Sequence, residues 1–148
     1  MSPRLHIGLV VNPLAGLGGS LALKGSDGEQ VRELAASLSP VELRRATDRV
    51  TRALAPLGEA VENGLVRLSC GRGPLGEEAL QALGLPYTAI GEQPEGLSSA
   101  DDTFRVVSGL RAAGIDLLVF AGGDGTARDV YDVLGSDFPV LGIPAGVK

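Results

Sequence analysis

The residues best suited to chemistry lie in one short run, Gly122–Thr126, whose sequence is Gly-Gly-Asp-Gly-Thr. It follows the apolar run Leu117–Ala121 and precedes a helical pattern from Ala127 to Leu134, so we expect a strand, a turn and a helix. Glycine allows positive φ and a close approach of the backbone to a ligand. The start of a helix directs N–H groups and partial positive charge at an anion. The pattern therefore predicts a phosphate-binding turn.

Asp124 is the unusual member of this segment, because a carboxylate beside a polyphosphate is repulsive. Its presence makes sense if it reaches a magnesium ion, directly or through water. It also makes sense if it accepts a proton from a hydroxyl that attacks a phosphoryl group. Both roles indicate phosphoryl transfer. The alternative is a glycine-rich connection that binds nothing.

Further candidates for ligand binding follow the first predicted strand, Leu5–Val11. Asn12 comes directly after it, at the carboxyl edge where open α/β sheets bind ligands. The loop Leu14–Gly28 is long for a compact domain, and such loops are often functional. It contains Lys24, which either meets a phosphate as a mobile charge or is solvated. We also count two of its glycines as candidates, Gly16 and Gly18.

A second glycine pattern, Gly71–Gly76, matches the dinucleotide fingerprint G-x-G-x-x-G. We discount it, because the fingerprint belongs to the first strand–helix connection and this is the second. With 22 glycines in the chain, a chance match is also not rare. A nucleotide contact at this edge of the sheet stays open.

The composition excludes several classes of protein. A length of 148 residues, 44% of them hydrophobic, suits one domain with a core, residues 1–148. A net charge of −5 and only 3% aromatic residues argue against a nucleic-acid partner. No apolar run approaches the length of a membrane-spanning helix, about 20 residues. The N-terminus does not resemble a signal peptide. We therefore expect a cytoplasmic protein. Cys70 and His6 are each alone and are expected to be packed, which leaves no metal site.

Strand and helix patterns alternate along the chain, which predicts an α/β fold: a doubly wound, Rossmann-like, three-layer parallel sheet of about five strands. The expected strands are Leu5–Val11, Leu65–Cys70, Pro86–Gly91, Leu117–Ala121 and Pro139–Ile143. The expected helices run from Ser26 to Leu38, from Pro40 to Gly58, over Pro74–Leu83, from Ser98 or Ser99 to Gly114, and from Ala127 to Gly135. On the second helix, Arg44, Arg45, Asp48, Arg49 and Arg52 are expected to form the solvated side. The sequence stops in a predicted ligand-edge loop, so we expect it to be the front part of a longer protein.

Three motifs together resemble those of the NAD kinase and diacylglycerol kinase superfamily. They are Asn12-Pro13-x-Ala15-Gly16, the Gly122–Thr126 segment, and Ile143-Pro144-Ala145-Gly146. The added Lys24–Gly28 is most similar to the ATP-NAD kinase branch associated with acetoin catabolism genes. The resemblance covers the whole chain but only the N-terminal α/β domain of that family. It implies that a C-terminal, mostly β domain, which grips NAD, is absent from this sequence.

The resemblance also implies roles for individual residues. Asp124 would assist the attacking hydroxyl or the metal. Phosphate oxygens would be held by Gly122, Gly123, Gly125 and Thr126, and positions near the nucleotide would be Asn12 and Gly146. The expected ligands are ATP with its Mg²⁺, and NAD as the acceptor that becomes NADP. The activity of this fragment alone is expected to be absent.

Two other functions stay open at this point. The first is a kinase for a lipid, a polyol or another small hydroxyl compound. For any of these kinases, the sequence leaves open whether the phosphoryl donor is ATP or polyphosphate. The second is a nucleotide-binding regulatory module without chemistry. Homo-oligomers are expected only from the resemblance.

Overall fold

The structure is a computed structural model that describes residues 4–15, 44–94 and 99–145. These residues form a five-stranded sheet in the order β3-β2-β1-β4-β5, in which every pair of neighbours is parallel. The strands are β1 (Leu5–Val11), β2 (Val66–Gly71), β3 (Thr88–Ile90), β4 (Leu117–Gly122) and β5 (Val140–Pro144).

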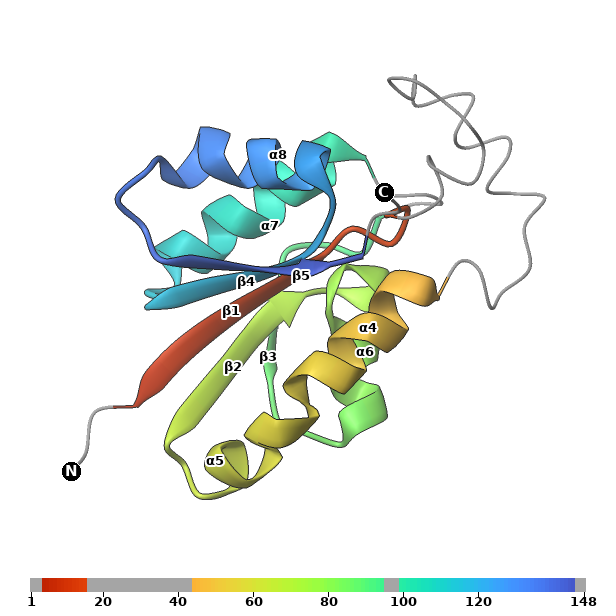
Figure 1. Cartoon of the computed structure of the whole chain (residues 1–148). Helices are drawn as coiled ribbons and strands as arrows, with labels where there is room; N and C mark the ends of the chain where they lie inside the picture. The colour runs from red at the N-terminus through yellow and green to blue at the C-terminus, as the bar shows by residue number, and fades with distance from the viewer. Residues whose placement is uncertain (1–3, 16–43, 95–98, 146–148) are drawn as a thin grey trace.

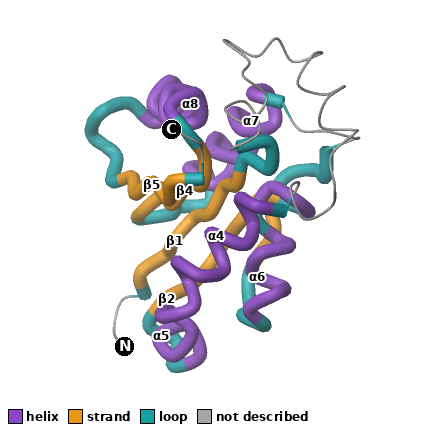
Figure 2. The backbone as a smooth tube through the Cα atoms, turned by 45° about the vertical axis from the view of Figure 1, so that its right-hand side comes forward, coloured by secondary structure: helices purple, strands orange, loops and turns teal. Residues whose placement is uncertain are grey.

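Helices cover both faces of this sheet, as Figure 1 shows and the rotated view in Figure 2 confirms. One face carries α4 (Arg45–Leu54), η1 (Ala55–Leu57), α5 (Gly58–Glu62) and α6 (Glu77–Leu83). The other carries α7 (Ala100–Ala112) and α8 (Asp124–Leu134), while η2 (Gly73–Leu75) links β2 to α6. The predicted doubly wound, three-layer α/β fold is therefore confirmed.

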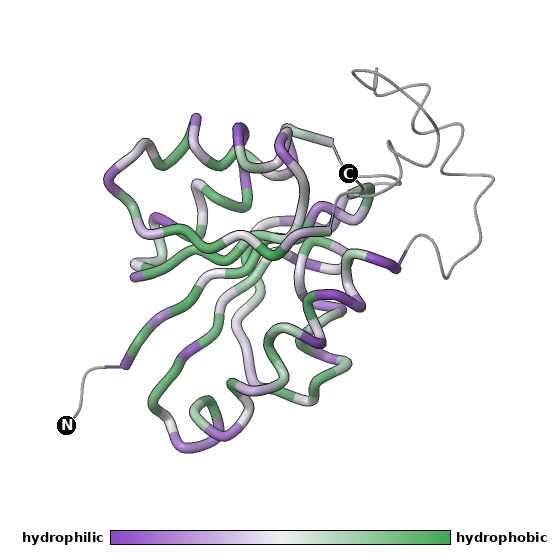
Figure 3. Tube along the Cα trace, in the orientation of Figure 1, coloured by the Kyte–Doolittle hydropathy of each residue, from purple (hydrophilic) through white to green (hydrophobic). Residues whose placement is uncertain are grey.

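The central strand β1 is buried from His6 to Val11, as expected of a parallel strand covered on both faces. Its alternate side chains enter two cores. Leu9 and Val11 pack in the core beneath α4 and α6, whereas Val10 packs in the core beneath α7 and α8. Figure 3 shows the strands as largely apolar and the outer turns of the helices as hydrophilic. This continuous burial fixes the carboxyl end of β1 in the middle of the sheet.

The order of the strands reverses between β1 and β4. From β1 the chain moves outward through β2 and β3, and it then returns to place β4 and β5 on the other side. Connections diverge at such a switch point, and open α/β sheets bind ligands in the crevice that results. Asn12 follows β1 and Gly123 follows β4, so both lie at this crevice.

Several predicted boundaries were wrong, mostly at glycines. Gly58 does not end a helix but begins α5. The predicted helix Pro74–Leu83 is split into η2 and α6, because Gly76 has φ +147°. The third strand is shorter than the predicted Pro86–Gly91, and α8 begins at Asp124, three residues earlier than predicted. The predicted helix between Ser26 and Leu38 lies outside the described residues.

The start of α7 was predicted with two alternative caps, of which the structure has Ser99. Its backbone N–H donates to Asp102 Oδ2 over 2.8 Å, within a complete capping box. Both of the side chains that cap α7 therefore come from its own first turn. Within the described part of the chain, no helix is long and apolar enough to cross a membrane.

Candidate functional site

The Gly122–Thr126 segment is a strand end joined directly to a helix start. Gly122 is the last residue of β4, Gly123 is the N-cap, and Asp124 is the first residue of α8. Gly123 has φ −108°, and neither Gly122 nor Gly125 has positive φ. The expectation that these glycines supply positive φ is therefore wrong, because the chain passes from strand to helix without a separate turn.

Gly122 is required by packing within the segment itself. A Cβ built on Gly122 would lie 2.3 Å from Thr126 Oγ1 and 2.5 Å from Thr126 Cβ. Thr126 is only 3% exposed, so it has no room to move aside. The absence of a side chain at Gly122 lets the first turn of α8 lie directly on the end of β4.

Asn12 holds this first turn against the end of β1. Its Nδ2 donates to Thr126 Oγ1 over 3.0 Å, and its Oδ1 accepts from the backbone N–H of Leu14 over 3.0 Å. The backbone N–H of Asn12 donates to the carbonyl of Ala121 over 2.9 Å. Both polar groups of the Asn12 side chain are thus used within the protein. In this structure Asn12 is a positioning residue, and the Thr126 hydroxyl is its partner.

The exposed part of the segment is Asp124 and Gly125. Gly123 has no side chain, and no side-chain hydrogen bond caps α8, in contrast to the box formed by Ser99 on α7. A helix of 11 residues presents its first backbone N–H groups and a partial positive charge at this end. A Cβ on Gly125 would meet nothing within 4 Å. This end of α8 can accommodate an anionic group beside the Asp124 carboxylate.

The end of β5 completes the same edge of the sheet. Pro144 pairs with Gly122 in the β4–β5 register, and the N–H of Ala145 donates to the carbonyl of Gly122 over 3.3 Å. The structure thus brings together Asn12, Gly122, Gly123, Asp124, Gly125 and Thr126. The other predicted binding residues, Gly16, Gly18, Lys24 and Gly146, lie outside the described residues.

The second glycine pattern is occupied by a carboxylate of the protein. Glu77 Oε1 accepts from the N–H of Gly73 over 2.9 Å, and Glu77 Oε2 accepts from the Tyr87 hydroxyl over 2.9 Å. These two hydrogen bonds, the one from Gly73 first, lower the pKa of Glu77. A Cβ built on Gly76 would lie 3.2 Å from the carbonyl oxygen of Leu9. The glycines of this pattern are thus explained by the fold, and Glu77 fills the position an anion would take.

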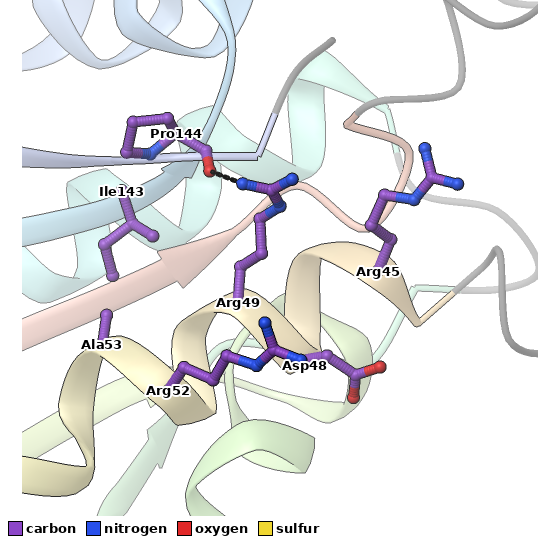
Figure 4. Close-up of a pocket in the computed structure, with 7 residues that line it drawn as sticks. All are labelled: Arg45, Asp48, Arg49, Arg52, Ala53, Ile143 and Pro144. Atoms are coloured by element: carbon purple, nitrogen blue, oxygen red, sulfur yellow. Dashed lines mark hydrogen bonds between the residues drawn. The ribbon is translucent and has the colours of Figure 1, made fainter.

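Sequence reasoning missed a pocket of about 650 Å³ between α4 and the end of β5. We call it the arginine pocket. It is lined by Arg45, Asp48, Arg49, Arg52, Ala53, Ile143 and Pro144 (Figure 4). The arginines were expected to be a plain solvated face of their helix. Their spacing, i, i+4 and i+7, places Arg45, Arg49 and Arg52 on one stripe of α4, but it does not tell which strand that stripe lies beside.

His6 and Cys70 are both buried, as predicted. His6 is 7% exposed, and its Nε2 shares a hydrogen bond of 2.7 Å with Ser69 Oγ. Cys70 is fully buried, and this burial raises its pKa to about 12. Neither side chain reaches the crevice at the ends of β1 and β4. In the described ranges, no group of three or more His, Cys, Asp and Glu residues could hold a metal ion.

A comparison with models of protein families gives a match over most of the chain. The family model described as ATP-NAD kinase N-terminal domain matches residues 7–148. This range includes β1 from Ile7 onward, the other four strands of the described sheet and the whole Gly122–Thr126 segment. No curated protein and no solved structure gives a significant match.

Proposed function

Because this chain belongs to the ATP-NAD kinase N-terminal domain family, we propose that it forms the phosphate-binding half of an ATP-dependent kinase that converts NAD to NADP. Membership in this family implies a kinase-like function that acts on nucleotides. The observation that carries the proposal is the position of Asp124. It is exposed on the first turn of α8, which the bond between Asn12 and Thr126 holds at the switch point.

In the proposed mechanism, the start of α8 holds phosphate oxygens through its backbone N–H groups. The absence of a side-chain cap on α8 and the open space at Gly125, both among the described residues, support this role. Asp124 acts on the acceptor: its carboxylate takes the proton of the hydroxyl as that oxygen bonds to the γ-phosphorus of ATP. The bond from the γ-phosphorus to the β,γ-bridging oxygen breaks, and ADP leaves with the electron pair of that bond. Asn12 and Thr126 do not touch the reacting atoms but fix the helix that carries Asp124.

The proposal assigns no resident metal to this part of the chain. Mg²⁺ enters with the nucleotide as part of the substrate, as is usual for phosphoryl transfer. Asp124 offers that ion at most one carboxylate, and the remaining ligands come from phosphate and water. The ion neutralises charge on the phosphates; positioning of the acceptor is left to the protein.

The acceptor is proposed to be NAD at its adenosine 2′-hydroxyl. We propose that the start of α8 forms the phosphate side of a cleft and that a second, mostly β domain supplies the contacts to the NAD ribose and adenine. The chain is accordingly expected to bind a nucleotide by itself but to transfer phosphate only when that domain is joined to it.

The test is Asp124→Asn in the protein expressed from its whole reading frame. We expect turnover of ATP and NAD to fall by at least about a hundredfold, the usual effect of removing a general base, with unchanged circular dichroism and midpoint of unfolding. The matched control is Asp132→Asn, an exposed carboxylate further along α8, which should leave turnover intact. Full activity of Asp124→Asn would contradict the proposed mechanism.

The acceptor is tested separately with labelled ATP and a panel of hydroxyl compounds. Label that appears on NAD, at its 2′ position, supports the proposal. Label that appears on a lipid or polyol while NAD stays unlabelled would contradict the proposed acceptor and keep the kinase. Binding of ATP without any transfer in the whole protein would contradict the kinase itself.

A further inference from the structure

The arginine pocket is a concentration of positive charge in an acidic protein. The chain has a formal net charge of −5, yet three arginines and one aspartate line this pocket. Arg45, Arg49 and Arg52 lie on one stripe of α4, where like charges three and four residues apart disfavour the helix slightly. One carboxylate cannot balance three guanidinium groups. The stripe therefore has a local cost that the fold of α4 does not explain.

These arginines are not used to stabilise the described structure through ion pairs. In residues 4–15, 44–94 and 99–145, no ion pair involves any of the three, and the one that is found joins Arg105 to Asp102. Arg49 makes a long, exposed hydrogen bond of 3.4 Å from its guanidinium to the carbonyl of Pro144, which Figure 4 shows. This contact turns the Arg49 side chain across the mouth of the pocket toward the end of β5.

The shape of the pocket also fits a small ligand. Its volume of about 650 Å³ lies within the range of small-molecule sites, roughly 300–1,000 Å³. Ala53 and Ile143 give it an apolar side, and the guanidinium groups give it a polar one (Figure 4). Guanidinium groups bind phosphate through paired N–H donors and hold their charge at any relevant pH. The pocket thus places an apolar surface, formed by the exposed Ala53 and the buried Ile143, next to the arginine side chains.

The pocket is separate from the start of α8. Pro144 lies opposite Gly122 in the β4–β5 register, so the two sites flank the same strand ends. However, α4 covers one face of the sheet and α8 covers the other. A ligand in the arginine pocket would therefore approach the end of β5 from the side opposite to Asp124.

We propose that the arginine pocket binds the phosphate groups of a phosphorylated small molecule, independently of the Gly122–Thr126 segment. Arg49 and Arg52 hold phosphate oxygens, Arg45 adds charge at the mouth, and Ala53 and Ile143 contact the uncharged part of the ligand. The site goes beyond the proposed kinase function, since nothing in that mechanism uses α4.

The experiment is an NMR titration of the ¹⁵N-labelled chain with sodium pyrophosphate at an ionic strength of about 0.15 M, where the Debye length is about 8 Å. Amides in the pocket, at Ala53 and Ile143, are observed separately from those of Gly123 and Gly125. We expect saturable shifts at Ala53 and Ile143. In the double variant Arg49→Gln/Arg52→Gln the dissociation constant should rise at least about tenfold, because two charge-assisted hydrogen bonds are lost.

The matched control is Arg105→Gln/Arg111→Gln, which removes the same charge from exposed positions of α7 on the opposite face. Its dissociation constant for pyrophosphate should stay within about twofold of the wild type, because screening weakens distant surface charges. An equal loss in this control, shifts confined to Gly123 and Gly125, or no saturable shift would each overturn the proposal. Asp124→Asn should leave the shifts at Ala53 and Ile143 unchanged, so this result is independent of the kinase assay.

Discussion

Asn12 donates a hydrogen bond to Thr126 over 3.0 Å, although the two residues are 114 positions apart in the sequence. The bond joins the end of β1 to the first turn of α8 across the switch point of the sheet. Thr126 is buried, and Asp124 is exposed two residues before it. The position of the helix turn that carries Asp124 therefore depends on a hydrogen bond between the partly exposed Asn12 and the buried Thr126.

The first prediction concerns this bond. Thr126→Val keeps the shape of the side chain but removes the acceptor of Asn12 Nδ2, so we expect the free energy of unfolding to fall by about 1–2 kcal/mol. Thr126→Ser keeps the hydroxyl and should lose less. Urea unfolding followed by circular dichroism measures both variants. Equal losses in the two variants would show that the methyl group, rather than the hydrogen bond, matters at this position.

The second prediction concerns the contact between β4 and α8. Gly122→Ala places a Cβ 2.3 Å from Thr126 Oγ1, and overpacking of this kind costs about 1–3 kcal/mol. Gly58→Ala is the control, because its new Cβ would lie 3.8 Å from Leu85, an ordinary contact. Thermal unfolding should show a lower midpoint for Gly122→Ala and no decrease for the control. A midpoint equal to that of the wild type in Gly122→Ala would mean that α8 can shift away from β4.

The sequence was sufficient for the architecture, for identifiable reasons. A central parallel strand is apolar on both faces, so the run from His6 to Val11 could be recognised directly. Ser99 was one of two serines predicted to begin α7, and the capping box that it forms with Asp102 was not foreseen. Boundaries at glycine were misjudged, because glycine usually ends a helix, whereas Gly58 and Gly125 take helical positions in the first turns of α5 and α8.

The site was predicted in part. Asn12 and Asp124 could be placed at the same edge because both follow predicted parallel strands. Their closeness depends on β1 and β4 being neighbours, and sequence patterns do not contain the order of strands. The arginine pocket was missed for the same reason, since it exists only because α4 lies beside β5. The Gly73–Glu77 contact depends on the positive φ of Gly76, which the pattern G-x-G-x-x-G does not specify.

The third prediction is a pH dependence that originates at His6. Burial, followed by the charge of Arg67, lowers its pKa below 6.5, while Asp116 and the carbonyl of Gly114 oppose this shift. At a pH between the native and the unfolded pKa, His6 is therefore mostly protonated in the unfolded chain and mostly neutral in the native protein. The associated stability is present above pH 6.5 and is lost as the pH falls toward the lower native pKa. Urea unfolding at a series of pH values should show this decline.

The control for this effect is His6→Gln, which can keep a hydrogen bond to Ser69 but does not titrate. The decline of stability just below pH 6.5 should be smaller in this variant than in the wild type. An identical decline would assign the effect to the carboxylates instead.

The fourth prediction concerns Cys70, the single cysteine of the chain. Its burial raises the pKa to about 12, so almost none of it is thiolate at neutral pH. We expect iodoacetamide to label the native protein very slowly and the urea-unfolded protein rapidly. The labelling rate should rise with urea in parallel with unfolding measured by circular dichroism. Rapid labelling without urea would show that the strand carrying Cys70 opens locally.

The fifth prediction separates stability from binding at Gly125. A Cβ at this position meets nothing within 4 Å, and alanine favours a helix over glycine by up to about 1 kcal/mol. Gly125→Ala should therefore be as stable as the wild type or more stable. If phosphate approaches the start of α8, the new methyl group occupies part of its path. We expect the affinity for Mg-ATP, measured by calorimetry, to fall about tenfold, a loss of about 1.4 kcal/mol.

The combination of these two results is what identifies the role of Gly125. Gly58→Ala serves again as the control, since α5 and α8 cover opposite faces of the sheet. The affinity of the Gly58→Ala protein for Mg-ATP should not change. A variant that is both less stable and weaker in binding would indicate damage to the fold. Unchanged affinity in a stable Gly125→Ala protein would contradict binding at this helix start. Weaker binding in a more stable protein is explained only if the ligand needs the space that the glycine leaves open.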